Sequence, residues 1–307
     1  MMSSLRRTVF TILAAACALP MVAQSVYTLE TLPADQFEPS IGFESIVGLH
    51  MDPQGNITGL ATKGTQRQLG FYWPSNGNPV RKLVFSTPSS ATDCEPKGID
   101  AEGLVHIYCN GISLNAVYEP TSGNYRELKA PEDRTFEVQG AGGELWSVGS
   151  SSRSGQGMGV PPNACSAATS EPTRTFGFVS TLRSGGDRVT ALLPLVPGDT
   201  TATSMTPSAI NIHAGIVGTR EGCGDVGVPS GRRAVLWKSR GGAWSANFLD
   251  RYPISLDTGI CARDLVLTEA RAINDSGQIT GAGYCIDSEG SRRSIAYRLT
   301  PTGVEAP

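Results

Sequence analysis

The sequence has few charged residues and few histidines. Of its 307 residues, 17% are charged and three are histidines, whereas 36 are glycines. This low charge content excludes a long solvated helix or coiled coil, and a hydrophobic content of 39% argues against wholesale disorder. The formal net charge of -3 leaves no broad basic surface, so we expect no nucleic acid partner.

Common catalytic and metal-binding motifs are also missing. The chain contains no Gly-x-Ser-x-Gly elbow, no P-loop, no His-Glu-x-x-His motif and no Cys-x-x-Cys pair. The glycine-rich stretch 154–159 does not join a strand to a helix, so we expect a loop there and not a phosphate site. We accordingly expect no catalytic residues, no cofactor and no metal.

Residues 1–25 have the pattern of a secretory signal peptide. Arg6 and Arg7 form a positive start, Val9–Leu19 are apolar, and a small residue, Ser25, suits cleavage after it. Cleavage after Ala23 is the alternative. We therefore expect a secreted or periplasmic protein.

A membrane anchor is not expected from this segment. Pro20 interrupts the apolar run before it reaches the roughly 20 residues of a membrane span, and no later segment is long enough. The sequence Ala-Ala-Ala-Cys that ends at Cys17 leaves a lipoprotein as the minor alternative. We expect one domain over residues 26–307, without a transmembrane segment.

An internal repeat is the main signal in the remainder of the chain. Its clearest copy, residues 272–281, has the sequence Ala-Ile-Asn-Asp-Ser-Gly-Gln-Ile-Thr-Gly. Echoes of it occupy residues 50–59, 98–105 and 209–218, and a degenerate copy lies at 138–145. Repetition at this spacing indicates a solenoid or a propeller.

Each copy predicts a tight β-hairpin turn. Asn or Asp opens such a turn by bonding to its own backbone, and glycine adopts the left-handed conformation without steric cost. In the fourth copy Ala214 replaces the turn glycine. The turns are expected at Asp52, Asp100, Gly140, Asn211 and Asn274.

The strands around these turns predict an all-β fold. Each copy is followed by short β-branched or aromatic runs, such as residues 234–237 and 244–249. Five four-stranded units predict a β-propeller, because one such sheet cannot bury both of its faces alone. The last unit lacks a strand, and Val26–Leu32 has the missing pattern, so the N-terminal strand is expected to complete it. An open β-solenoid is the alternative.

The repeat resembles that of the bacterial extracellular HAF-repeat family. Residues 272–281 are similar to its A-I-N-D-x-G-Q-V-V-G motif, residues 233–237 to H-A-F-L-W, and Thr28–Leu32 to its closing strand. The histidine of the second motif is missing from every copy. The resemblance implies export and a propeller-like fold, and it brings no established catalytic residues.

In the oxidising compartment that export implies, an even number of cysteines favours disulfides. Six cysteines remain beyond Cys17. Two pairs each flank one hairpin, and the last two cysteines lie in insertions after equivalent strands of adjacent repeats. We therefore expect the pairs Cys94–Cys109, Cys261–Cys285 and Cys165–Cys223.

Calcium binding is the alternative explanation for the turn acids Asp52, Asp100 and Asp275 and for Asn274. Calcium loops place several oxygen ligands in one short loop, whereas each of these turns offers one or two carboxylates. The hairpin explanation is therefore favoured. The histidines His50, His106 and His213 occupy three different positions of the repeat, so we do not expect them to form one ring.

Aromatic and arginine side chains are the remaining candidates for a binding surface. Trp73 and Trp237 are expected in the core between units, and core packing is favoured over sugar stacking for Trp146 and Trp244. Insertions are expected over residues 149–173 and 219–232. Their arginines are expected to be solvated, with a surface for an anionic glycan as the alternative: Arg153, Arg220, Arg232 and Arg233.

These observations favour a non-enzymatic, monomeric binding module that contacts an unknown protein or glycan through loops on one propeller face. The alternative is a secreted carbohydrate-active hydrolase or lyase, which would place two carboxylates roughly 5–9.5 Å apart in the central funnel. A third hypothesis is an inert cell-surface scaffold.

Overall fold

The computed structural model describes most of the chain after residue 25. The described residues are 26–37, 39–64, 67–87, 90–109, 114–127, 138–139, 145–153, 174–182, 188–199, 202–222, 231–256, 260–261 and 263–303. Several predictions lie outside them: the signal peptide with Cys17, the turn at Gly140, the stretch 154–159 and the pair Cys165–Cys223. Among the described residues, no helix is long and apolar enough to cross a membrane.

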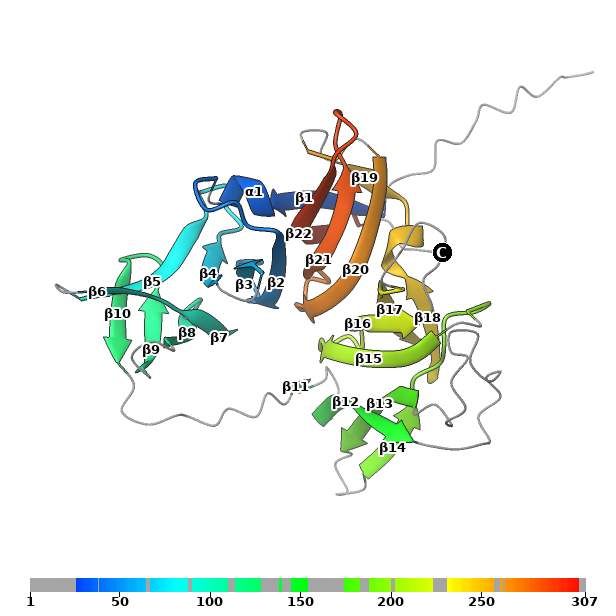
Figure 1. Ribbon diagram of the computed structural model, residues 1–307. Helices are drawn as coiled ribbons and strands as arrows, with labels where there is room; N and C mark the ends of the chain where they lie inside the picture. Colours follow the sequence, from blue (N-terminus) through cyan, green and yellow to red (C-terminus); the bar gives the residue numbers. More distant parts are fainter. Residues whose placement is uncertain are drawn as a thin grey trace, which may run out of the picture.

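The fold is an all-β propeller whose five repeat units the sequence predicts, and one parallel pair between β13 and β15 joins units 3 and 4 into a single sheet (Figure 1). Unit 1 contains β2 (Ser45–Met51), β3 (Ile57–Lys63), β4 (Arg67–Trp73) and β5 (Arg81–Thr87). Unit 2 contains β7 (Glu95–Ile99), β8 (Val105–Cys109), β9 (Leu114–Glu119) and β10 (Asn124–Glu127). Unit 3 contains β11 (Val138–Gln139), β12 (Leu145–Arg153), β13 (Arg174–Leu182) and β14 (Arg188–Leu192).

Units 4 and 5 follow along the chain. Unit 4 contains β15 (Ala202–Ile210), β16 (Ile216–Gly222), β17 (Arg233–Arg240) and β18 (Ala243–Phe248). Unit 5 contains β20 (Arg263–Ile273), β21 (Ile279–Ile286), β22 (Arg292–Pro301) and β1 (Tyr27–Pro33). The first strands of the five units, β2, β7, β11, β15 and β20, lie nearest the centre in Figure 1. The minor elements are β6 (Ser90–Asp93), β19 (Ile254–Leu256), the helical turn α1 (Ala34–Phe37) and a 3-10 turn at Leu249–Arg251.

A bulge in the first strand of a unit explains why glycine recurs in the second strand, at Gly59, Gly218 and Gly281. In unit 5 the pairing of β20 with β21 shifts between Ala270 and Ala272. A Cβ atom on Gly281, which lies opposite this bulge, would overlap the carbonyl oxygen of Glu269. Units 1 and 4 repeat the arrangement, so the glycine records a close approach of two backbones.

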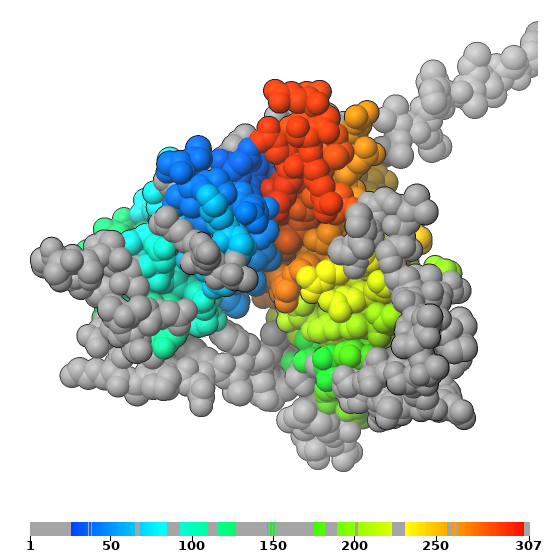
Figure 2. Space-filling view, viewed as in Figure 1, coloured from blue at the N-terminus to red at the C-terminus, as the bar shows by residue number. Residues whose placement is uncertain are grey.

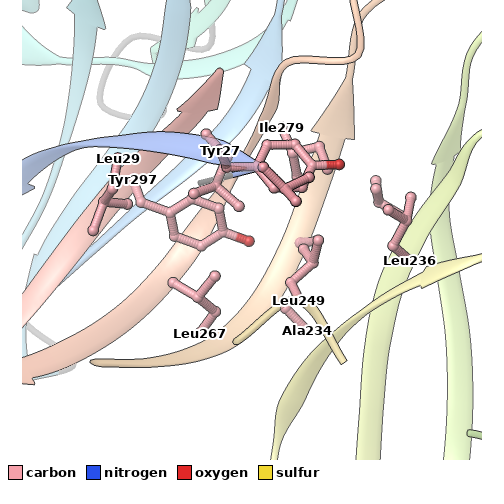
Figure 3. Close-up of a cluster of buried hydrophobic side chains, with 12 residues drawn as sticks. Tyr27, Leu29, Ala234, Leu236, Leu249, Leu267, Ile279 and Tyr297 are labelled. Atoms are coloured by element: carbon pink, nitrogen blue, oxygen red, sulfur yellow. The ribbon is translucent and has the colours of Figure 1, made fainter. Parts of the chain in front are cut away.

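Hydrophobic clusters join neighbouring units. Separate clusters of described residues lie between units 1 and 2, 3 and 4, 4 and 5, and 5 and 1. Figure 3 shows the cluster between units 4 and 5, where the Tyr297 ring points toward the side of Leu249. Each sheet buries its apolar side chains against a neighbouring sheet, because a single sheet would leave them exposed to water.

The tryptophans follow the prediction of core packing. Trp237 is fully buried between units 3 and 4, and its indole N–H donates to the carbonyl oxygen of Pro194 (2.9 Å). Trp73 is buried in the cluster between units 5 and 1. Trp146 and Trp244 are partly buried and pack against the same core as Trp237.

The N-terminal strand completes unit 5, as predicted. All seven residues of β1 pair antiparallel with β22, from Tyr27 opposite Pro301 to Pro33 opposite Ile295. On the edge of β1 that faces away from β22, β19 pairs parallel with β1. The sequence pattern did not predict this strand. In Figure 2 the N-terminal segment, in blue, lies directly against the C-terminal segment, in red.

Two of the three expected disulfides are confirmed, Cys94–Cys109 in unit 2 and Cys261–Cys285 in unit 5. The predicted bounds of the two insertions are wrong. Strand β12 continues to Arg153 and β16 continues to Gly222. Polar residues extend these strands because the ladder uses backbone groups, and β13 and β15 supply the partners of the last residues.

Deletion of residues 26–32 from the mature chain is expected to reduce the free energy of unfolding by at least about 3 kcal/mol. The deletion removes Leu29, which is 2% exposed, and Tyr27, which is 5% exposed, from the core between units 4 and 5. Urea unfolding followed by circular dichroism measures this loss. A chain shortened by residues 304–307 is the control, and equal midpoints for the two truncations would refute closure by β1.

Candidate functional site

The hairpin turns of units 1, 2, 4 and 5 lie at one end of the propeller, which we call the turn face. In each turn the side-chain oxygen of the first residue accepts a hydrogen bond from the backbone N–H four residues later. The four bonds are Asn56 to Asp52 (2.8 Å), Leu104 to Asp100 (2.9 Å), Gly215 to Asn211 (2.8 Å) and Gln278 to Asn274 (2.9 Å). The hairpin interpretation of these residues is therefore confirmed.

The turn asparagines also join neighbouring units. The amide of Asn211 donates to the carbonyl oxygen of Asn274 (3.0 Å), and the amide of Asn274 donates to that of Asp52 (3.2 Å). Asp52 is 1% exposed, and burial raises the pKa of its carboxyl. Asp52 has no side-chain amide, so the series of asparagine donors ends at unit 1.

A cleft of about 360 Å³ opens on the turn face between units 4 and 5. Its base is apolar and includes Leu236 of β17, Ile273 of β20 and Tyr27 of β1. Leu236 and Tyr27 are 2% and 5% exposed, so they are fixed by the core beneath the cleft. Figure 3 shows the hydroxyl of Tyr27 pointing toward the side of Leu236.

The rim of this cleft is polar and carries charges of both signs. Lys238 and Arg240 follow Leu236 at alternate positions of β17 and therefore share its face of the sheet. Opposite them lie Asp275 and Ser276 in the turn of unit 5. The turn that contains Asp275 was predicted from the sequence, whereas the cleft beside this turn was not.

A second cleft, of about 260 Å³, lies between units 1 and 2. It is lined by Tyr72, Asn76, Asn78 and Arg81 of unit 1 together with the connection between β9 and β10 of unit 2. The Arg81 guanidinium spans this boundary by donating to the carbonyl oxygen of Pro120. Both clefts therefore lie where two propeller units meet.

The prediction that Arg220 is a solvated loop residue is wrong. Arg220 lies on β16 with 0% of its surface exposed. Its guanidinium contacts both carboxylate oxygens of Asp199 at 2.7 Å and donates to the carbonyl oxygen of Gly231 (2.8 Å). Burial of arginine is tolerated here because the carboxylate pairs with it in a bidentate geometry.

Arginines also hold the carboxylates that the structure brings together between units 4 and 5. Arg232 contacts Glu221 at 2.8 Å and Glu269 at 2.5 Å, and Arg271 contacts the other oxygen of Glu269 at 2.5 Å. Arg233 likewise pairs with a carboxylate, that of Asp250. These carboxylates make ion pairs within unit 4 and between units 4 and 5, so they contribute to holding the two units together.

The histidines and turn acids do not form a common site among the described residues. His50 lies on β2, His106 lies on β8 at 3.6 Å from Asp100, and His213 lies in the turn of unit 4. No group of three or more His, Cys, Asp or Glu side chains within the described part of the chain has a geometry that suits a metal ion.

Comparisons with known proteins give no family assignment. No family model and no curated protein matches the chain. A virginiamycin B lyase from Staphylococcus aureus is 10% identical over 87% of this chain and 73% of its own, with a TM-score of 0.24. A gluconolactonase from Xanthomonas campestris is 9% identical over 90% of this chain and 91% of its own, with a TM-score of 0.27.

A subtype N11 neuraminidase-like protein of the strain A/flat-faced bat/Peru/033/2010 (H18N11) is 9% identical, over 93% of this chain and 96% of its own, with a TM-score of 0.32. These similarities are loose. The fold assignment therefore rests on the strand pairing of this chain itself, and no activity follows from the similarities.

Ala214→Gly is expected to stabilise the protein by about 1 kcal/mol. Ala214 has a φ of 58°, a left-handed conformation that costs a residue with a Cβ atom about 1–2 kcal/mol. Gly277→Ala, at a φ of 75° in the equivalent turn, is the matched reverse change and is expected to destabilise by a similar amount. Urea midpoints that move in the same direction for both variants would contradict this explanation.

Stability is expected to fall on acidification because of His50. Burial lowers the pKa of His50 from 6.5 to about 4, although its bond to the Pro96 carbonyl opposes that change. The folded state thus binds fewer protons than the unfolded state, so stability present above pH 6.5 is lost as the pH falls toward 4. The loss attributable to this group is on the order of 2–3 kcal/mol.

Urea unfolding at several pH values in this interval tests the assignment. His50→Gln is expected to flatten the pH dependence, whereas His213→Gln, at an exposed position, is expected to retain it. Identical pH dependence for the two variants would exclude His50 as the responsible group.

Proposed function

We propose that this chain is an exported propeller of the HAF-repeat type that binds a protein or glycan through its turn face and catalyses no reaction. The observation that carries the proposal is the cleft between units 4 and 5, with its apolar base and charged rim. Concave sites that combine an apolar lining with a few polar groups are typical of ligand binding. Binding residues commonly lie on connections held by a rigid scaffold.

Export is supported by the disulfides. Cys94–Cys109 and Cys261–Cys285 each lie within one unit, and such bonds persist in oxidising compartments. The signal peptide over residues 1–25 would deliver the chain to the extracellular or periplasmic side, where a repeat protein of this type is expected to act.

A binding role is favoured over the hydrolase or lyase alternative because carboxylates that lie close together are paired with arginines. Glycosidases of the common type use two carboxylates that flank the scissile bond. Between units 4 and 5, Glu221 and Glu269 instead accept hydrogen bonds from Arg232, and Glu269 is also held by Arg271. Carboxylates engaged in this way are occupied by structural partners.

A glycan array, a screen for captured secreted proteins and polysaccharide turnover assays on the mature protein test the proposal together. Ser276→Trp, at an exposed position on the rim, is expected to weaken binding at least about ten-fold by filling the cleft. Ser288→Trp places the same bulk on an exposed turn at the opposite end of unit 5 and is expected to leave binding unchanged.

Catalytic turnover of a polysaccharide would overturn the proposal in favour of the enzyme. Loss of binding in Ser288→Trp but not in Ser276→Trp would assign the function to the other face. Failure to bind any probe would favour an inert scaffold.

A further inference from the structure

We infer that the cleft between units 4 and 5 takes an acidic oligosaccharide, whose carboxylates face Lys238 and Arg240. This inference rests on the proposed binding function and names the class of ligand for the same site. Three properties of the cleft support it: its shape and base, the balance of its charges, and the strands that form its walls.

The size and base of the cleft suit a short run of sugar rings. A volume of about 360 Å³ lies at the lower end of the range for small-molecule sites. Sugar rings present apolar C–H surfaces as well as hydroxyls, so they suit the partly exposed Ile273 and Pro301 beneath a polar rim. Ser276, which also lines the cleft, carries a hydroxyl of the kind that can hydrogen bond to a sugar.

The charges of the cleft favour an anion. Lys238 and Arg240 contribute two positive charges, and Asp275 is the one acidic residue among the described residues that line the cleft. Asp275 keeps its negative charge while its carboxylate accepts a hydrogen bond from the backbone N–H of Ile212 (3.2 Å), and the Lys238 ammonium lies 5.8 Å from the centre of the Tyr252 ring. The described residues of the lining therefore carry a net positive charge.

The strands around the cleft argue against an extended peptide as the ligand. A peptide bound by strand addition needs an unpaired strand edge. Strand β17 is paired on both sides, with β16 and β18, and β22 is paired with β21 and β1. Strand β1 is in turn enclosed by β22 and β19. Recognition here thus depends on side chains and turns, as it does for a sugar that carries hydroxyl and carboxylate groups.

Calorimetric titration of the mature protein with trigalacturonate tests this inference. Its fully methyl-esterified form, which keeps the rings and removes the charge, is the matched ligand control. Lys238→Gln and Arg240→Gln are each expected to weaken trigalacturonate binding at least about five-fold. Arg126→Gln removes an exposed positive charge from β10 of unit 2 and is expected to have no effect. Unchanged unfolding midpoints confirm that the variants fold.

Three results would overturn the inference: no binding of trigalacturonate, equal binding of its methyl ester, or equal affinities for Arg240→Gln and Arg126→Gln. Tighter binding of the peptide acetyl-Glu-Glu-Glu-amide would assign the cleft to an acidic protein segment instead. The proposed function survives any of these results if another ligand binds and Ser276→Trp abolishes its binding. It fails separately if Ser276→Trp leaves all binding intact.

Discussion

The insertion of β1 between β22 and β19 is the constraint on which the rest of the molecule depends. The strand pairs over seven residues with β22 and over three with β19. Its side chains reach both neighbouring cores, since Leu29 belongs to the cluster between units 4 and 5 and Leu32 packs against the cluster between units 5 and 1. The same strand supplies Tyr27 to the base of the cleft. Closure of the ring and formation of the candidate site are therefore one event.

Local chemistry made much of the fold predictable. An Asn or Asp followed by glycine specifies a turn within a few residues, and the repetition of that turn indicated both the propeller and the missing strand. The register of Cys94 and Cys109 around one turn was enough to predict their disulfide. Each of these inferences used residues that are neighbours in the sequence or members of the same repeat.

Features formed by segments that are distant in the sequence and lie outside the repeated motif were not predicted. Arg220 and Asp199 are partners in space, but neither belongs to the repeated motif, so no periodic signal connects them. Strand β19 has three residues and lies in the connection between units 4 and 5, too short to show a pattern. The cleft combines residues near positions 27, 213, 238 and 275, and only the packing of units 4 and 5 brings them together.

The turns also show that the four units whose turns are described are not equivalent. Asparagine side chains join unit 4 to unit 5 and unit 5 to unit 1, whereas Asp52 and Asp100 occupy the same position in units 1 and 2. A carboxylate caps its own turn as well as an amide does but lacks the donor that reaches the next turn. Among the described residues, hydrophobic clusters likewise join units 3, 4, 5, 1 and 2 in that order.

The two ends of the described chain are hydrogen bonded to each other, since the backbone N–H of Thr302 donates to the carbonyl oxygen of Val26 (3.0 Å). The described chain thus begins and ends at one place in the fold. A short linker from residue 303 to residue 26 would join the two ends covalently, and new ends could then be opened at another exposed turn. A chain that begins at a different unit could therefore keep the same arrangement of units in space. This property makes the protein suitable for circular permutation.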